Sequence, residues 1–79
     1  MDLPRGGSVK RSVRIAGHPT SVSLEPEFWD ELKSIASSRG SSINKLITEI
    51  DATRRTNLSS ALRVFVLKAV RAGPTGGEN

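Results

Sequence analysis

Three cations near the N-terminus, Lys10, Arg11 and Arg14, offer the clearest chemistry in the chain. They are interleaved with Val13 and Ile15, a pattern that suits a basic arm lying along phosphates or entering a groove of nucleic acid. Two other interpretations stay open. The segment can be a solvated charged tail, or it can form a hairpin in which residues 13–15 fold back on residues 20–22.

His18 lies at the margin of this segment and is the only histidine in the sequence. Next to a proline it is more often a solvated side chain than a base or a ligand. The chain has no cysteine, which excludes disulfides, thiolate metal sites and cysteine nucleophiles. A single histidine leaves no cluster for zinc, and no nucleophile–base pair or phosphate loop is visible. We therefore expect no metal, no cofactor and no enzymatic activity.

The net charge of +4 and the pI of about 10.4 favour a polyanionic partner, with nucleic acid first and an acidic membrane surface second. A basic protein without such a partner is the alternative. The apolar run at residues 64–67 is far too short to span a bilayer. The N-terminus has no apolar core of the kind found in signal peptides. We expect a cytoplasmic protein without membrane contact.

The elements that would position these residues begin with residues 20–24, where Thr20, Val22 and Leu24 point one way and Pro19, Ser21 and Ser23 the other. Alternation of period two predicts a half-buried strand. At Pro26 the period becomes helical, because proline suits the first turn and Phe28, Leu32 and Ile35 then share a face. Arg39-Gly40 suits the C-terminal end of this helix.

Two further helices follow. Ser41 and Ser42 can cap the second, and Asn57 or Ser59 the third, over about residues 57–72. The predicted core and dimer contacts share apolar or strand-face positions: Thr20, Val22, Leu24, Phe28, Trp29, Leu32, Ile35, Ile43, Leu46, Ile47, Ile50, Leu62 and Phe65. The third helix is apolar over so wide a face that it needs cover from the core or from another subunit.

The predicted fold is therefore mainly α-helical with one short strand, in one domain over residues 10–72 that starts with the basic arm at 10–18. Residues 1–9 and 73–79 are expected to be disordered. A lone strand leaves a row of backbone groups unpaired, and its simplest partner is the same strand of a second copy. The sequence predicts an antiparallel ribbon across a homodimer.

A strand, a helix, a Gly-Ser-Ser turn and a second helix over residues 20–50 resemble the ribbon-helix-helix family of DNA-binding proteins. The longer sequence from Lys10 through residues 57–65 is similar to that of a subgroup of short bacterial members that have a third helix. The resemblance implies a homodimer whose two-stranded ribbon enters the major groove of DNA, with pairing of dimers on DNA as a further option.

Carried over by position, the resemblance makes Pro19, Ser21 and Ser23 the groove-facing residues. It places backbone amides of residues Ser41, Ser42 and Ile43 on a DNA phosphate, a role that suits a helix N-terminus. Serine discriminates weakly between bases. We therefore expect some specificity to come from Arg11, Arg14 or His18, or from DNA shape.

The leading functional hypothesis is a homodimeric, sequence-specific DNA-binding protein that regulates transcription. One alternative is an antitoxin that binds both its own promoter and a toxin. Another is a protein-interaction module that uses the apolar face of the third helix, residues 58–70.

Overall fold

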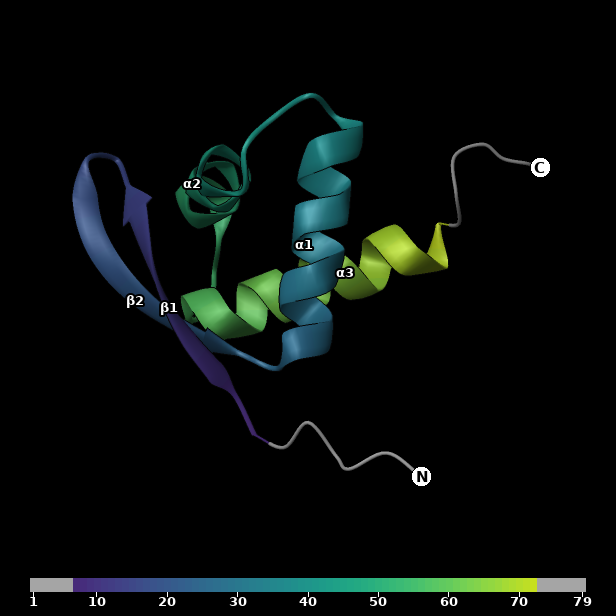
Figure 1. The fold of residues 1–79 in the computed structure, drawn as a ribbon, viewed down its shortest axis with the longest axis horizontal. Coiled ribbons are helices and arrows are strands. Elements are labelled where there is room, and N and C mark those ends of the chain that lie inside the picture. The colour runs from purple at the N-terminus through teal and green to yellow at the C-terminus, as the bar shows by residue number, and fades with distance from the viewer. Residues whose placement is uncertain (1–6, 73–79) are drawn as a thin grey trace.

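The computed structural model describes residues 7–72, which form a β-hairpin and three helices. The elements in chain order are β1 (Val9–Ile15), β2 (His18–Leu24), α1 (Pro26–Ser38), α2 (Ile43–Thr53) and α3 (Leu58–Arg71). In Figure 1 the hairpin flanks the helices, α2 is seen end-on between the hairpin and α1, and α3 passes behind α1. Residues 1–6 and 73–79, for which the sequence predicts disorder, lie outside the described part.

The three helices are confirmed and an antiparallel two-stranded ribbon is present, but it lies within one chain, so the prediction of a single strand per chain is wrong. β1 and β2 pair with each other, with Ile15 opposite His18 and Val9 opposite Leu24. The segment expected to be an extended basic arm is therefore a strand, and the hairpin interpretation of residues 13–22 is the one that the structure contains. Val9, assigned to the disordered lead-in, begins β1.

The hairpin forms because two residues suffice to reverse the chain. Ala16 and Gly17 have φ values of 52° and 85°, the positive values that a tight type I′ turn requires at both central positions. Such a turn matches the twist of the flanking strands. Glycine adopts this conformation freely, whereas Ala16 is strained in it.

The ribbon has one apolar face, which packs on the helices. Val22 and Leu24 of β2 are buried and Thr20 is half-buried, and Val13 and Ile15 of β1 are buried on the same face. Cross-strand partners share a face in an antiparallel ladder, so the two strands contribute a single apolar layer.

The helices close the core from the other side. Their fully buried side chains come from all three helices, and they are Trp29, Leu32, Leu46, Ile47 and Leu62. The other predicted core residues, Phe28, Ile35, Ile43, Ile50 and Phe65, are partly buried against this cluster. Ala36 and Val66 are buried as well. On the outer side of α3, Val64, Leu67 and Val70 remain about half exposed.

Local signals account for the helix boundaries. Pro26 occupies the first turn of α1, and Gly40 ends the helix with a φ of 66°. The Ser42 hydroxyl accepts a hydrogen bond from the Lys45 N–H at 3.1 Å and caps α2. The Asn57 side chain accepts from the Ser60 N–H at 2.9 Å and caps α3. These caps satisfy amides that a helix cannot satisfy by itself.

Candidate nucleic-acid interface

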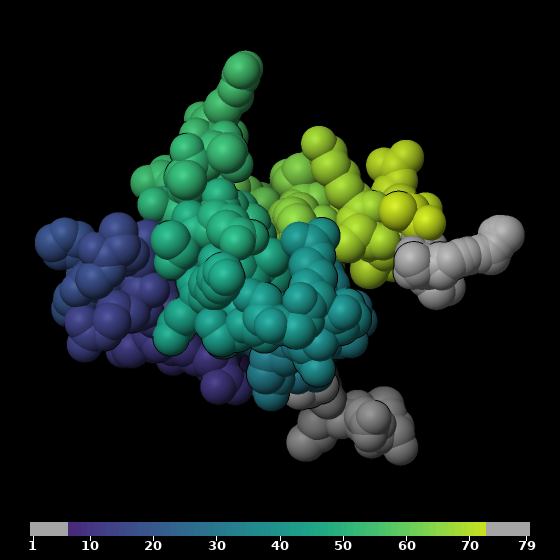
Figure 2. All heavy atoms as spheres, turned by 90° about the horizontal axis from the view of Figure 1, so that it is seen from above, coloured from purple at the N-terminus to yellow at the C-terminus, as the bar shows by residue number. Residues whose placement is uncertain are grey.

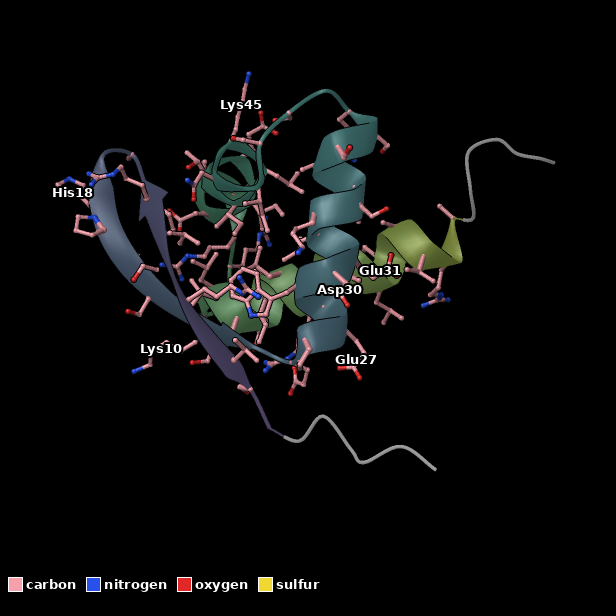
Figure 3. All side chains as sticks on the ribbon, viewed as in Figure 1. Lys10, His18, Glu27, Asp30, Glu31 and Lys45 are labelled. Carbon is pink, nitrogen blue, oxygen red and sulfur yellow. The ribbon has the colours of Figure 1, made fainter. Side chains whose placement is uncertain are left out.

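The face of the ribbon turned away from the helices is polar and basic. The register places Lys10 opposite Ser23, Ser12 opposite Ser21 and Arg14 opposite Pro19. These three pairs alternate with the apolar ones, so all six side chains stand on this outer face. All are exposed except Ser23, which is half-buried. In Figure 3, Lys10 projects from the ribbon away from the helices.

The four residues expected to act together as a basic arm are divided between the two faces. Lys10 and Arg14 stand on the outer face beside Ser21 and Ser23. Arg11 belongs to the inner face, opposite Val22, and its guanidinium carbon lies 5.5 Å from the centre of the Trp29 ring. His18 is exposed next to the turn, opposite Ile15.

Ser12 is an outer-face residue that sequence reasoning missed. Its position follows once β1 is recognised as a strand, because Lys10, Ser12 and Arg14 recur with period two. The signal was present in the sequence, but the two neighbouring cations suggested an arm.

Arg14 is fixed by contacts at the edge of β1. Its backbone N–H donates to Asn44 Oδ1 at 3.3 Å, and the Thr48 hydroxyl lies 3.5 Å from its carbonyl oxygen. The Arg14 guanidinium donates to the carbonyl of Gly17 at 3.1 Å. α2 therefore holds the backbone at one edge of the ribbon, and the carbonyl of Gly17 in the turn holds the Arg14 side chain.

The N-terminus of α2 offers fewer free amides than the sequence predicted. The Ser41 N–H donates to the Ala36 carbonyl at 2.8 Å, so this amide already has a partner within the chain. The N–H groups of Ile43 and Asn44 lie in the first turn, where no intrahelical acceptor exists. Together with the helix dipole they favour an anion.

Charge is distributed unevenly over the molecule. Figure 3 shows Lys10 and His18 on the hairpin, and Glu27, Asp30 and Glu31 along α1. In Figure 2 the hairpin occupies one end of the molecule and the C-terminal part of α3 the other. The outer face of the ribbon carries two cations and no carboxylate, which favours contact with a polyanion.

Within residues 7–72, no group of three or more His, Cys, Asp or Glu residues could hold a metal ion. In the same part of the chain, no helix has the length and apolar character needed to cross a membrane.

The model of one protein family, described as a ribbon-helix-helix domain, matches residues 8–70. The chain belongs to the ribbon-helix-helix family. This confirms the resemblance found in the sequence, and the family is one of DNA-binding regulators.

Among solved structures, the ribbon-helix-helix chain is similar to an uncharacterized protein from Bordetella pertussis Tohama I. The two share 33% sequence identity with a TM-score of 0.67. The similarity covers 86% of this chain but 63% of that one, so the present chain spans less than two thirds of its relative. No curated protein matches the chain.

Proposed function

We propose that this protein regulates transcription by binding duplex DNA, as a homodimer, with the outer face of its ribbon. The observation that carries this proposal is the presence of Lys10 and Arg14 on the same face as Ser21 and Ser23. A two-stranded ribbon fits the major groove, where each base pair presents a distinct pattern of donors and acceptors. Such a role makes the protein a binding protein of the cytoplasm rather than an enzyme.

The hairpin removes the first argument for a homodimer, because β2 already has a partner in its own chain. The edge of β2 that faces away from β1 still favours pairing with a second copy. The pair Ile15–His18 closes the turn, so hydrogen-bonded pairs recur at every second position from there. The backbone groups of Pro19, Ser21 and Ser23 then point away from β1. The hydrogen bond from the Ser59 hydroxyl to the Ser23 carbonyl, at 3.1 Å, agrees with this direction.

These groups are complementary to those of a second copy. If two β2 strands pair antiparallel about Ser21, each Ser21 exchanges both its hydrogen bonds with Ser21 of the other copy. Ser23 then lies opposite Pro19, whose carbonyl accepts from the Ser23 N–H. Pro19 has no N–H that could donate to the Ser23 carbonyl, but this carbonyl already accepts from the Ser59 hydroxyl. This register therefore satisfies the outward-facing backbone groups of all three residues.

In the resulting sheet of four strands, the central and the outer strands would contact different parts of the DNA. Neighbouring strands lie about 4.8 Å apart, so the two central β2 strands fit a major groove about 12 Å wide. The β1 strands lie about 7 Å from the two-fold axis by the same spacing, near the phosphates at the groove margins. Ser21 and Ser23 would therefore meet base edges, while Lys10 and Arg14 would meet the DNA backbone.

The test is selection of bound sites from random duplexes, followed by titrations of the selected site at several salt concentrations. Each neutralised phosphate contributes about 0.9 to the slope of log K against log salt. Removing Lys10 or Arg14 by alanine deletes two cations per dimer, so each slope should fall by about 2. Lys68→Ala, on α3, is the matched control and should leave the slope unchanged.

Two other outcomes would refute parts of this proposal. An affinity that does not depend on salt would exclude backbone contacts by Lys10 and Arg14. A selected motif without two-fold symmetry would exclude the homodimer on DNA.

Ser21→Ala should relax base preference in the selected motif with little change in the salt slope.

A second candidate function is supported by the exposed apolar side chains of Val64, Leu67 and Val70 on α3. A surface of this kind suits a protein-interaction module, and it would serve an antitoxin equally well. Retention of a stable complex with a second protein after loss of all DNA binding would favour this function over the first.

A further inference from the structure

A cavity of about 390 Å³ opens between β1, α1 and the start of α2. Three elements that are distant in the sequence contribute to its lining, which consists of Arg11, Ser12, Val13, Trp29, Lys33, Ile43 and Asn44. Its volume falls in the lower part of the range of small-molecule sites, about 300–1,000 Å³. The side chains proposed to contact DNA, Lys10, Arg14, Ser21 and Ser23, are not among these lining residues.

One side of the cavity is apolar and well fixed. Val13 and Trp29 are buried, and Ile43 is partly buried beside them. The indole N–H of Trp29 donates to the Val9 carbonyl at 2.9 Å, which holds the ring against β1. Because Trp29 is only 1% exposed and Val13 6%, the partly buried Ile43 is the apolar side chain that a bound molecule could contact most.

The remaining lining is positive and rich in donors. Arg11 and Lys33 are both exposed, and none of the seven lining residues is acidic. The Arg11 guanidinium stands 5.5 Å from the centre of the Trp29 ring. The Oδ1 atom of Asn44 already accepts from the Arg14 N–H, which leaves its amide nitrogen as a donor. An anion is the group that complements such a lining.

We propose that this cavity binds a small organic anion. Its acidic group lies beside Arg11 and Lys33, and its apolar body lies against Ile43, next to the buried Val13 and Trp29. The bound molecule would join β1 to α1 and α2, and so fix the position of the ribbon relative to the helices. This proposal goes beyond the proposed function and does not depend on DNA binding.

The single tryptophan of the chain provides the measurement. Its indole N–H gives one signal in a ¹H–¹⁵N correlation spectrum of the full chain, and this signal reports directly on the cavity. Benzoate and phenyl phosphate are the probes, and they differ in the acidic group. Acetate lacks the apolar body, and benzamide lacks the charge.

Benzoate, phenyl phosphate or both should shift the indole signal in a saturable way, with a Kd on the order of 1 mM for fragments of this size. Acetate and benzamide should give no saturable shift at the same concentrations. The probe that binds more tightly identifies the acidic group, carboxylate or phosphate, that the cavity prefers.

Arg11→Ala and Lys33→Ala should each raise this Kd at least about fivefold, because each removes one charge-assisted contact. Lys68→Ala, which lies outside the cavity, should leave it unchanged, and the rest of each spectrum verifies that the variants are folded. Equal binding of benzamide, or Kd values that do not respond to Arg11 and Lys33, would overturn the proposal. So would the absence of saturation with both anionic probes.

Discussion

The indole N–H of Trp29 donates a hydrogen bond to the carbonyl of Val9 across 20 positions of sequence, at 2.9 Å. This bond connects the first turn of α1 to the start of β1. Trp29 is 1% exposed, so the bond lies in a part of the molecule where water competes weakly. It sets the distance between the ribbon and the helices, and with it the direction of the outer face.

Replacing Trp29 by Phe should therefore loosen the N-terminal half of β1. The variant loses the hydrogen bond and part of the buried ring, so we expect a loss of about 1–3 kcal/mol in the free energy of unfolding. Urea unfolding followed by circular dichroism measures this loss. Amide exchange should increase in β1 more than in α2, and an even increase along the chain would contradict the anchoring role.

The turn of the hairpin offers a stabilising substitution. Ala16 has a φ of 52°, a conformation that costs an alanine roughly 1–2 kcal/mol. Asn-Gly is a preferred pair in type I′ turns, and Gly17 already occupies the second position. Ala16→Asn should therefore raise the free energy of unfolding by about 0.5–1 kcal/mol. Asn introduced at exposed Ala52 of α2 is the control and should not stabilise the protein.

The helices were predictable from the sequence because each carries its own boundary signals. Pro26, Ser42 and Asn57 stand at or just before the first turns, and Gly40 follows α1. These signals act over three or four residues. Between them, the apolar residues that recur with the helical period mark the body of each helix. The sequence also predicted which side of β2 faces the helices.

The hairpin was harder to predict, because its evidence depends on two strands at once. Lys10, Arg11 and Arg14 suggested a basic arm, and the alternation in β1 became clear only beside β2. The turn uses a non-glycine residue, Ala16, at positive φ, which no local preference predicts. The cavity could not be predicted from the sequence for a similar reason, since Arg11, Lys33 and Ile43 come together only after the whole chain has folded.

The ion pair between Arg63 and Glu25 should make stability depend on pH. Arg63 Nε donates to Glu25 Oε1 at 3.0 Å. The Arg63 guanidinium lowers the pKa of Glu25, chiefly through this hydrogen bonding, and backbone hydrogen bonding near Glu25 adds to the effect. Because the pKa is lowered in the folded state, the stabilisation is present above the ordinary Glu pKa. It disappears as the pH falls through the lowered value.

Glu25→Gln should accordingly lower the Tm at neutral pH, and the difference from the wild type should vanish in acid. The effect should be small, because both side chains are partly exposed to solvent. Thermal unfolding between neutral and acidic pH measures it. In an Arg63→Gln background the same substitution should have little effect, and an undiminished effect there would show that the pair is not responsible.

The absence of cysteine from the chain allows the proposed pairing of β2 strands to be tested by single substitutions. In the register centred on Ser21, the two Ser21 residues form a hydrogen-bonded pair with Cα atoms about 5.5 Å apart. This separation lies within the range that a disulfide spans. Ser21→Cys should therefore give a disulfide-linked dimer under mild oxidation, visible on a non-reducing gel and lost on reduction.

Ser12→Cys is the matched control, because Ser12 lies opposite Ser21 on the same face. In the sheet of four strands the two Ser12 residues are three strand spacings apart, about 14 Å, so this variant should remain monomeric on the same gel. Efficient linkage through residue 12 with none through residue 21 would place the contact at the edge of β1. Failure of both variants to link, with DNA binding intact, would exclude pairing of the ribbons by either edge. If duplex DNA increases the yield of the Ser21→Cys disulfide, then pairing of the β2 strands and DNA binding are coupled. DNA can only favour a dimer that it binds better than the separate chains.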